Sequence, residues 1–424
     1  MGRIFFRRVN VIDGIDPPKA NTTVVVEGDR ITAVGVDSAV PKPSAEDTIF
    51  DLEGRSLMPG MWSCHCHLTY DNVASVTDVD MKHPPAYTAL WAARNATLLL
   101  NSGFTGMIGA GSPFGVDVAL KQASAEGLIR APRVIPSGRM LVTIAGGTDT
   151  FPSFWKSQMS EASSYVCTGA TEFRAAARHL MKDGVEMIKI FATGGPGGTF
   201  SGDVLGMSKD EIDAVVQTAH ERGMKVRAHA LGREGTRLAL KAGVDLVDHG
   251  LDMDDACIEL MARQGTFFNP GVHESYTMVE LGRKTGTTPF GPPEIYDPFV
   301  EFYRKTLPKA LAAGVKLVVG DDWGLYGIPH DGSYAKELED WVEGMGVLPL
   351  DVLRCATRNG AEVAGMKDDL GTIEPGKLAD LLIINGNPVD DITILQDHQK
   401  LEVIMKNGEF MECQLTPKTT AKAA

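Results

Sequence analysis

Two histidines spaced two residues apart are the first candidates for chemistry in this chain. His65 and His67 stand at the end of an apolar run. Successive side chains of a strand alternate between its faces, so these two imidazoles are expected to point the same way. Two neutral imidazoles that converge on one point suit a zinc-class metal ion. Two surface histidines can also have this spacing by chance, without binding a metal. The rest of the chain is needed to choose between these two interpretations.

Four further polar residues lie at or near the ends of apolar runs that read as strands. They are Lys189 in 184–191, His229 in 225–229, His249 in 244–249 and Asp322 in 315–322. Each has an ordinary structural alternative: a hydrogen-bonded core histidine, a lysine reaching a rim with its ammonium, or an aspartate capping a turn. Six polar residues at equivalent strand ends are poorly explained by six independent accidents. The sequence therefore predicts one shared site.

The elements that would position these residues alternate between strands and helices. The best marked helix follows Ser208 and Glu211, which form a capping box, and Gly223 stops it. Repeated strand–helix alternation predicts parallel strands, whose natural closed form is an α/β (β/α)₈ TIM-like barrel. Enzymes of this architecture hold their sites at the carboxyl ends of the strands, where the six residues are expected.

The two ends of the chain have a different pattern from its middle. Short apolar strands separated by glycine turns occupy the first 58 residues and recur after residue 370, which indicates antiparallel β-structure. We therefore predict a barrel inserted in a small β-sandwich domain that both ends form. The predicted boundaries are 1–58 with 366–415 for the β-domain, 59–365 for the barrel, and 416–424 for a disordered tail.

Composition narrows the class of function. The chain has 424 residues, 43% of them hydrophobic, and a formal net charge of −14 without a prominent basic patch. That charge argues against a nucleic-acid partner. No apolar run approaches the length of a membrane span, and no signal peptide is evident, which predicts a soluble protein with no membrane partner. Six scattered cysteines do not suggest a disulfide framework, and we expect a cytoplasmic location.

Taken in order, these motifs resemble the amidohydrolase superfamily, in particular its prolidase and imidazolonepropionase-like branch. The resemblance runs nearly end to end. It rests on Pro59-Gly60 before His65-Cys66-His67, Ile188-Lys189-Ile190, Thr193-Gly194-Gly195, Ala228-His229-Ala230, Asp248-His249-Gly250, Gly320-Asp321-Asp322 and the closing run from Gly371 to Asp380.

The resemblance implies a binuclear metal site with two divalent ions, Zn²⁺ being the expected metal. Carried over, His65, His67 and Asp322 would bind the more buried ion, and His229 and His249 the other. Lys189, carboxylated by carbon dioxide to a carbamate, would bridge both. The metals would supply a bridging hydroxide, and Asp322 would take its proton and pass it to the leaving nitrogen. By the same analogy, the partners would be a small-molecule amide and further copies of this chain.

Two departures bear on the substrate. Related dipeptidases usually carry a histidine where this chain has Thr148, and a tyrosine where it has Leu231. Both family residues help to orient or polarise the substrate carbonyl. Their absence favours an aryl amide, N-acyl amino acid, urea or carbamate over a dipeptide. An Xaa-Pro-type or general dipeptidase is the first alternative, and a non-catalytic scaffold, which predicts eroded ligands, ranks lower.

Three other residues near the predicted site have open roles. Arg233 and His330 are candidates for substrate contact, although His330 has a surface-loop role as an equal alternative. Asp321 stands where serine or threonine is usual. It would add a second carboxylate beside Asp322, and we prefer its interpretation as a hydrogen-bonded turn residue.

Overall fold

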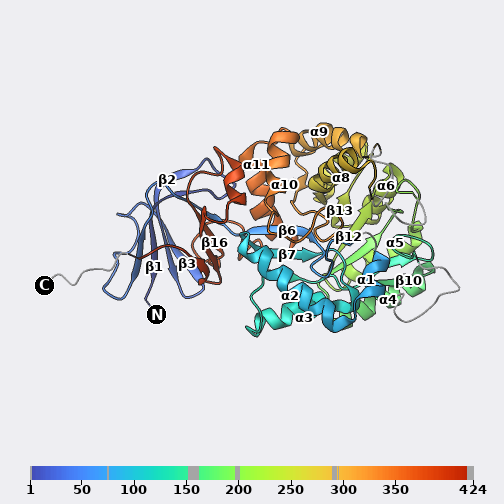
Figure 1. The fold of residues 1–424 in the computed structure, drawn as a ribbon, viewed down its shortest axis with the longest axis horizontal. Coiled ribbons are helices and arrows are strands. Elements are labelled where there is room, and N and C mark those ends of the chain that lie inside the picture. Colours follow the sequence, from blue (N-terminus) through green and yellow to red (C-terminus); the bar gives the residue numbers. More distant parts are fainter. Residues whose placement is uncertain are drawn as a thin grey trace.

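The computed structural model describes residues 2–73, 76–150, 162–195, 201–288, 294 and 296–417. The predicted disordered tail, 416–424, lies outside the described residues from position 418 onward. Figure 1 shows a β-sheet at one end of the molecule and a larger body of strands ringed by helices at the other. Strands from the start and from the end of the chain, such as β1 and β16, lie together at the sheet.

Strands from both chain ends form one mixed sheet. Its order is β18-β17-β16-β5-β1-β2-β3, and β4 also pairs with β1. The strands are β1 (Ile4–Val11), β2 (Lys19–Glu27), β3 (Arg30–Gly35), β4 (Thr48–Asp51), β5 (Ser56–Pro59), β16 (Leu381–Ile384), β17 (Leu401–Lys406) and β18 (Glu409–Cys413). Gly28, at φ 62°, makes the two-residue hairpin between β2 and β3. The segment 48–59 holds two short strands, β4 and β5, which pair with β1 at different points along its length.

Parallel strands form the larger body, as the alternation predicts. The strands are β6 (Met61–Cys66), β7 (Phe104–Gly109), β8 (Arg133–Ile135), β9 (Met140–Thr143), β10 (Ser164–Cys167), β11 (Met187–Phe191), β12 (Lys225–Ala230), β13 (Leu246–His249), β14 (Phe267–Asn269) and β15 (Lys316–Leu317). They lie in two parallel sheets, β6-β7-β8 and β10-β9-β11-β12-β13-β14-β15. The fold is the predicted α/β barrel, with strands of both chain ends in the accompanying sheet.

Backbone hydrogen bonds join the two parallel sheets into a closed barrel. On one side the Glu186 amide donates to the Pro136 carbonyl at 2.8 Å, and on the other the Cys64 amide donates to the Val319 carbonyl at 2.8 Å. The expected strand over 315–322 is regular only at Lys316–Leu317. At Gly320 the chain passes so close to β6 that a Cβ would lie 2.3 Å from the backbone nitrogen of His65. Only glycine permits this approach, which brings the Asp322 segment beside the two histidines.

Helices cover the outside of the barrel (Figure 1). They are α1 (Val76–Lys82), α2 (Pro85–Asn101), α3 (Val116–Ala125), α4 (Gly169–Asp183), α5 (Lys209–His220), α6 (Arg233–Ala242), α7 (Asp255–Gln264), α8 (Val272–Thr285), α9 (Asp297–Ala312), α10 (Lys336–Glu339), α11 (Pro349–Arg354) and α12 (Gly360–Val363). The predicted capping box of α5 is confirmed, with Ser208 and Glu211 satisfying each other's backbone. Among the described helices, none is both long and apolar enough to cross a membrane.

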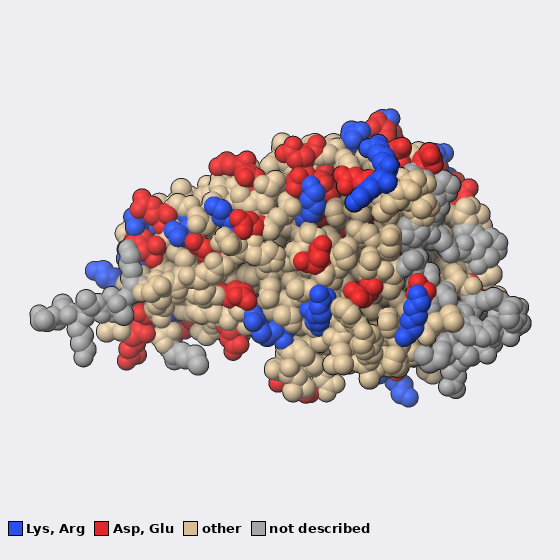
Figure 2. Space-filling model, in the orientation of Figure 1, with Lys and Arg blue, Asp and Glu red and all other residues tan. Residues whose placement is uncertain are grey.

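Charged side chains are mixed over the visible surface. Figure 2 shows lysines and arginines standing beside aspartates and glutamates on this face rather than gathering in a continuous basic area. Pairs of opposite charge occur on the surface of the protein, for example Lys309 with Asp255 and Lys336 with Glu339. Exposed pairs of this kind contribute little to stability.

Candidate active site

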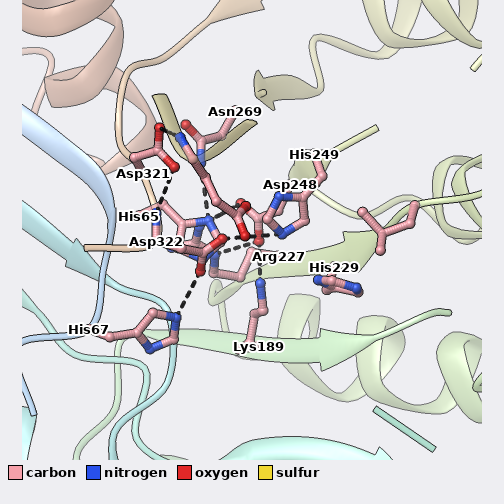
Figure 3. A network of polar contacts seen from close by, with 12 residues as sticks. His65, His67, Lys189, Arg227, His229, Asp248, His249, Asn269, Asp321 and Asp322 are labelled. Carbon is pink, nitrogen blue, oxygen red and sulfur yellow. Dashed lines mark hydrogen bonds and ion pairs between the residues drawn. The ribbon is translucent and has the colours of Figure 1, made fainter. Parts of the chain in front are cut away.

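The six predicted metal-binding residues lie together at the carboxyl ends of the barrel strands (Figure 3). His65 is in β6 and His67 follows it; the others come from β11, β12, β13 and the segment after β15. All six side chains are buried, between 1% and 7% exposed. The parallel barrel accounts for this convergence, because every strand ends on the same face.

Asp322 lies at the centre of the group. Its Oδ1 is 2.9 Å from His65 Nε2 and 3.2 Å from His67 Nε2, and its Oδ2 is 3.9 Å from His249 Nε2. Burial alone would raise the pKa of this carboxyl, but the neighbouring His65 holds it well below its usual value. Ligand atoms of His65, His249 and Asp322 all lie within 4.8 Å of one another, close enough to share one ion.

The second pair of histidines lies beside this centre. The rings of His229 and His249 are 4.7 Å apart, and the His229 ring stacks on Phe191 at 4.4 Å. Burial lowers the pKa of His229 well below its usual value and that of His249 to about 3. Both are therefore neutral imidazoles, the form that binds metal. His249 has a left-handed backbone, φ 66°, the kind of strain that concentrates at functional sites.

The hydrogen bonds of His67 show that these residues fit a cation. Its Nδ1 lies 3.1 Å from the Gly111 carbonyl, and a carbonyl only accepts, so Nδ1 carries the proton. Burial lowers the pKa of His67, which leaves Nε2 as a bare lone pair facing Asp322 Oδ1 at 3.2 Å. Two acceptors that face each other repel unless a positive ion lies between them. The donor set therefore suits a divalent metal bound through His67 Nε2 and the Asp322 carboxylate.

Asn269 gives a second sign of the same fit. Its Nδ2 lies 3.1 Å from His65 Nδ1, while its Oδ1 is buried and has no partner among the described residues. Amide oxygen and nitrogen are placed by inference, and turning this amide by 180° would let Oδ1 accept from His65 Nδ1. That arrangement puts the proton of His65 on Nδ1 and leaves Nε2 free to bind a metal.

Lys189 belongs to a network of buried charges beside the metal-binding residues (Figure 3). Its Nζ lies 2.5 Å from Asp248 Oδ2, and burial lowers the pKa of its ammonium while Asp248 opposes that shift. Arg227 contacts both oxygens of Asp248, at 3.0 and 2.5 Å. The remaining contact of Asp248 is with His65 Nδ1 at 3.3 Å. Asp248 thus links two predicted metal ligands, His65 and Lys189, to the buried guanidinium of Arg227.

Two more carboxyl groups stand beside Asp322. Asp321 accepts from the Asp322 amide through Oδ1 and from the Glu274 amide through Oδ2, both at 2.9 Å. The hydrogen bonds expected of Asp321 are present, but the residue is not in a turn, and its carboxylate also lies within 4.8 Å of that of Asp322. The Glu274 carboxylate lies within 4.8 Å of both aspartates. Burial, with Asp322 and Asp321 nearby, raises the pKa of Glu274 well above its usual value.

The structure places the four predicted substrate contacts in different surroundings. Thr148 Oγ1 lies 2.5 Å from Ser164 Oγ, and Leu231 is half-buried directly after β12. Neither observation tests a contact with substrate, so that role of both residues stays a prediction. Arg233 is exposed and donates to Asp252 through two bonds, of 3.2 and 3.1 Å. The surface-loop alternative for His330 is wrong: the ring is 3% exposed. Its Nε2 donates to the His67 carbonyl at 3.1 Å, so His330 holds the backbone of His67 in place.

Four residues of this site were missed in the sequence: Arg227, Asp248, Asn269 and Glu274. Arg227 precedes His229 by two positions on a strand, so the alternation that linked the first two histidines also places it inward. Asp248 was noticed only as a neighbour of His249. Glu274 lies on α8, a helix that the sequence analysis did not predict.

Comparison with known proteins places this geometry in context. Residues 56–411 match the profile described as the Amidohydrolase family. Ochratoxinase of Aspergillus niger is 26% identical over 428 residues, covering 95% of this chain and 85% of that protein. Imidazolonepropionase of Rhizobium meliloti is 26% identical over 398 residues, covering 85% of this chain and 84% of that protein. A solved Xaa-Pro dipeptidase with bound methionine in the active site is 29% identical, with a TM-score of 0.85, and covers 97% of this chain and 100% of its own.

Proposed function

The chain belongs to the amidohydrolase family and is a hydrolase of carbon–nitrogen bonds, and from that premise we propose a binuclear metal-dependent enzyme for small-molecule amides. The observation that carries this proposal is the arrangement around Asp322. Its carboxylate faces the unprotonated Nε2 of His67 and also lies near His65 and His249. Such a set of acceptors requires positive charge, and divalent ions supply it.

We assign His65, His67 and Asp322 to the more buried ion and His229 and His249 to the other, with Zn²⁺ as the expected metal. When bound, the ions lower the pKa of a water molecule and polarise the scissile carbonyl. Asp322 accepts the proton of that water and returns it to the leaving nitrogen. Lys189 would help to hold the ions as a carbamate, and burial favours the neutral amine that must react with carbon dioxide to form it. Residues 59–365 form the catalytic unit, which the β-domain of 1–58 and 366–415 supports.

The expected substrates are aryl amides, N-acyl amino acids, ureas or carbamates. This preference rests on Thr148 and Leu231, which replace the histidine and tyrosine of the dipeptidase pattern. A dipeptidase is the second candidate, because a solved Xaa-Pro dipeptidase is similar over nearly the whole chain. Cytoplasmic location and association with further copies of the chain remain predictions.

Turnover of a substrate panel by metal-loaded protein tests the proposal. The panel holds dipeptides, N-acyl amino acids, aryl amides and aryl ureas, and we expect a preference for the last three. Asp322→Asn should lower kcat by about 10²- to 10⁴-fold, the usual contribution of a general base, while His220→Asn on the surface leaves it unchanged. Retained turnover in Asp322→Asn would remove that residue as the base. Faster turnover of ordinary dipeptides would favour the second candidate.

A further inference from the structure

The ring of His249 differs from the other three imidazoles of the proposed metal site, because the described residues give it no hydrogen bond. Its Nε2 lies 3.9 Å from Asp322 Oδ2, which is too long for one. The other rings have partners: Asn269 for His65, the Gly111 carbonyl for His67 and the Gly194 carbonyl for His229. Such partners normally fix the orientation of a metal-binding imidazole. A different contact must therefore orient His249.

The backbone of His249 is strained. This residue ends β13 with φ 66°, and the Gly250 amide donates to the Asp248 carbonyl at 2.8 Å. A hydrogen bond across one residue of positive φ is the rare and strained form of the γ-turn. A residue other than glycine stays in this conformation only where surrounding contacts hold it. The direction of the imidazole depends on the turn, because the Cα–Cβ bond moves with the backbone.

Tyr303 supplies one of the contacts that hold this turn. It lies on the buried face of α9, and its side chain is 1% exposed. Its hydroxyl donates to the His249 carbonyl at 3.1 Å, and no other side chain of the described residues donates to that oxygen. At the other end of the same peptide group, the Gly250 amide donates to the Asp248 carbonyl and also to the Ala230 carbonyl, at 2.9 Å. The peptide group between His249 and Gly250 is thus fixed at both its oxygen and its nitrogen.

We propose that Tyr303 is a positioning residue for metal binding, whose hydroxyl keeps the turn at His249 in the strained form that directs the imidazole into the shared site. Without the hydroxyl, the peptide group is free to rotate toward an ordinary backbone conformation, and Nε2 moves from its place beside Asp322. The ion that depends on His249 then binds more weakly, whereas the ion of His65 and His67 keeps its ligands. This inference rests on the proposed function of the site.

Titration of metal-free protein with Co²⁺, followed by its visible absorption, tests the inference without requiring turnover. Wild type should bind two ions. Tyr303→Phe removes only the hydroxyl, so it should bind one ion as wild type does and the other about 10-fold more weakly, as expected when a partner of a metal ligand is lost. Tyr296→Phe is the matched control, because this buried hydroxyl at the start of α9 has no hydrogen bond with the described residues. It should bind both ions like wild type.

A second background separates positioning from general support of the barrel. His229→Asn should keep only the ion of His65, His67 and Asp322, and adding Tyr303→Phe should leave its affinity unchanged. Two ions bound by Tyr303→Phe with wild-type affinity would overturn the inference. So would equal weakening of both ions, or weaker binding in the His229→Asn background, since either would make Tyr303 a general structural residue. Fewer than two ions in wild type would contradict the proposed function and, with it, the inference.

Discussion

Replacing Arg227 with methionine should destabilise the barrel strongly. The guanidinium is fully buried, contacts both oxygens of Asp248, and donates through Nη1 to the carbonyls of Cys64 at 2.8 Å and Gly109 at 3.0 Å. It thereby joins β6, β7, β12 and β13 beneath the metal-binding residues. Methionine fills a similar volume but leaves the Asp248 carboxylate without its main counter-ion and two carbonyls without donors.

Breaking a buried ion pair by removing one partner costs about 3–5 kcal/mol, a large part of the roughly 5–15 kcal/mol that stabilises a typical fold. With an unfolding entropy of about 2.1 cal/mol/K per residue, this corresponds to a melting temperature lower by about 3–6 °C. Lys189 still faces Asp248 in the variant, which argues for the lower half of that range.

Urea unfolding of metal-free protein is the appropriate assay, because bound ions would add their own stabilisation. Arg233→Met is the matched control: Arg233 pairs with Asp252 on the surface, and its loss should change the free energy of unfolding by less than about 0.5 kcal/mol. Arg227→Met combined with Asp248→Asn should cost less than the sum of the single changes, since the two residues share one interaction. If Arg227→Met is as stable as Arg233→Met, the reasoning about this buried network is wrong.

Three further predictions concern single residues. Asn269→Ala should weaken metal binding about 10-fold in a chelator competition, because His65 Nδ1 loses one of its two partners and keeps only Asp248 at 3.3 Å; unchanged affinity would refute that role. Gly320→Ala should abolish metal binding or folding, because its Cβ would lie 2.3 Å from the backbone nitrogen of His65. Gly314→Ala, with open space around it, should lower the free energy of unfolding by only about 1 kcal/mol. Burial raises the pKa of Asp117 from 3.8 to about 6, so the native state holds this proton more tightly than the unfolded chain. The stabilisation is complete below the unfolded pKa and is lost as pH rises through about 6. Relative to Asp117→Asn, wild type should therefore lose about 3 kcal/mol between pH 3.5 and pH 7, and a constant difference across that range would show that Asp117 does not titrate in this way.

Four of the proposed metal-binding residues could be predicted because regular strands present them: His65, Lys189, His229 and His249. His67 and Asp322 follow strands that have already ended. Alternation along β6, continued one residue beyond its end, predicts His65 and His67 on one face, and parallel pairing brings the ends of β11, β12 and β13 to the same edge. Neither inference needs tertiary detail. The barrel and the sheet shared by both chain ends follow from the same patterns of alternating strands, helices and glycine turns.

The remaining features depend on contacts between distant segments. Glu274 reaches the site through α8, which begins after Gly271 without a side-chain cap and with a mixed apolar pattern. Asp248 and Arg227 become partners only when β12 pairs with β13. The burial of His330 depends on the segment after β15 folding back onto His67, a contact 263 residues apart in the chain. Contacts between segments so far apart in the chain leave no local pattern in the sequence.

The metal content of the purified protein tests the central claim most directly. After exhaustive removal of loosely bound ions, elemental analysis of wild type should find close to two divalent metal ions per chain, and His229→Asn should retain about one, because His65, His67 and Asp322 still hold theirs. His220→Asn, on the surface of α5, should keep both. Well under one ion per wild-type chain, or the same content in wild type and His229→Asn, would contradict a binuclear site.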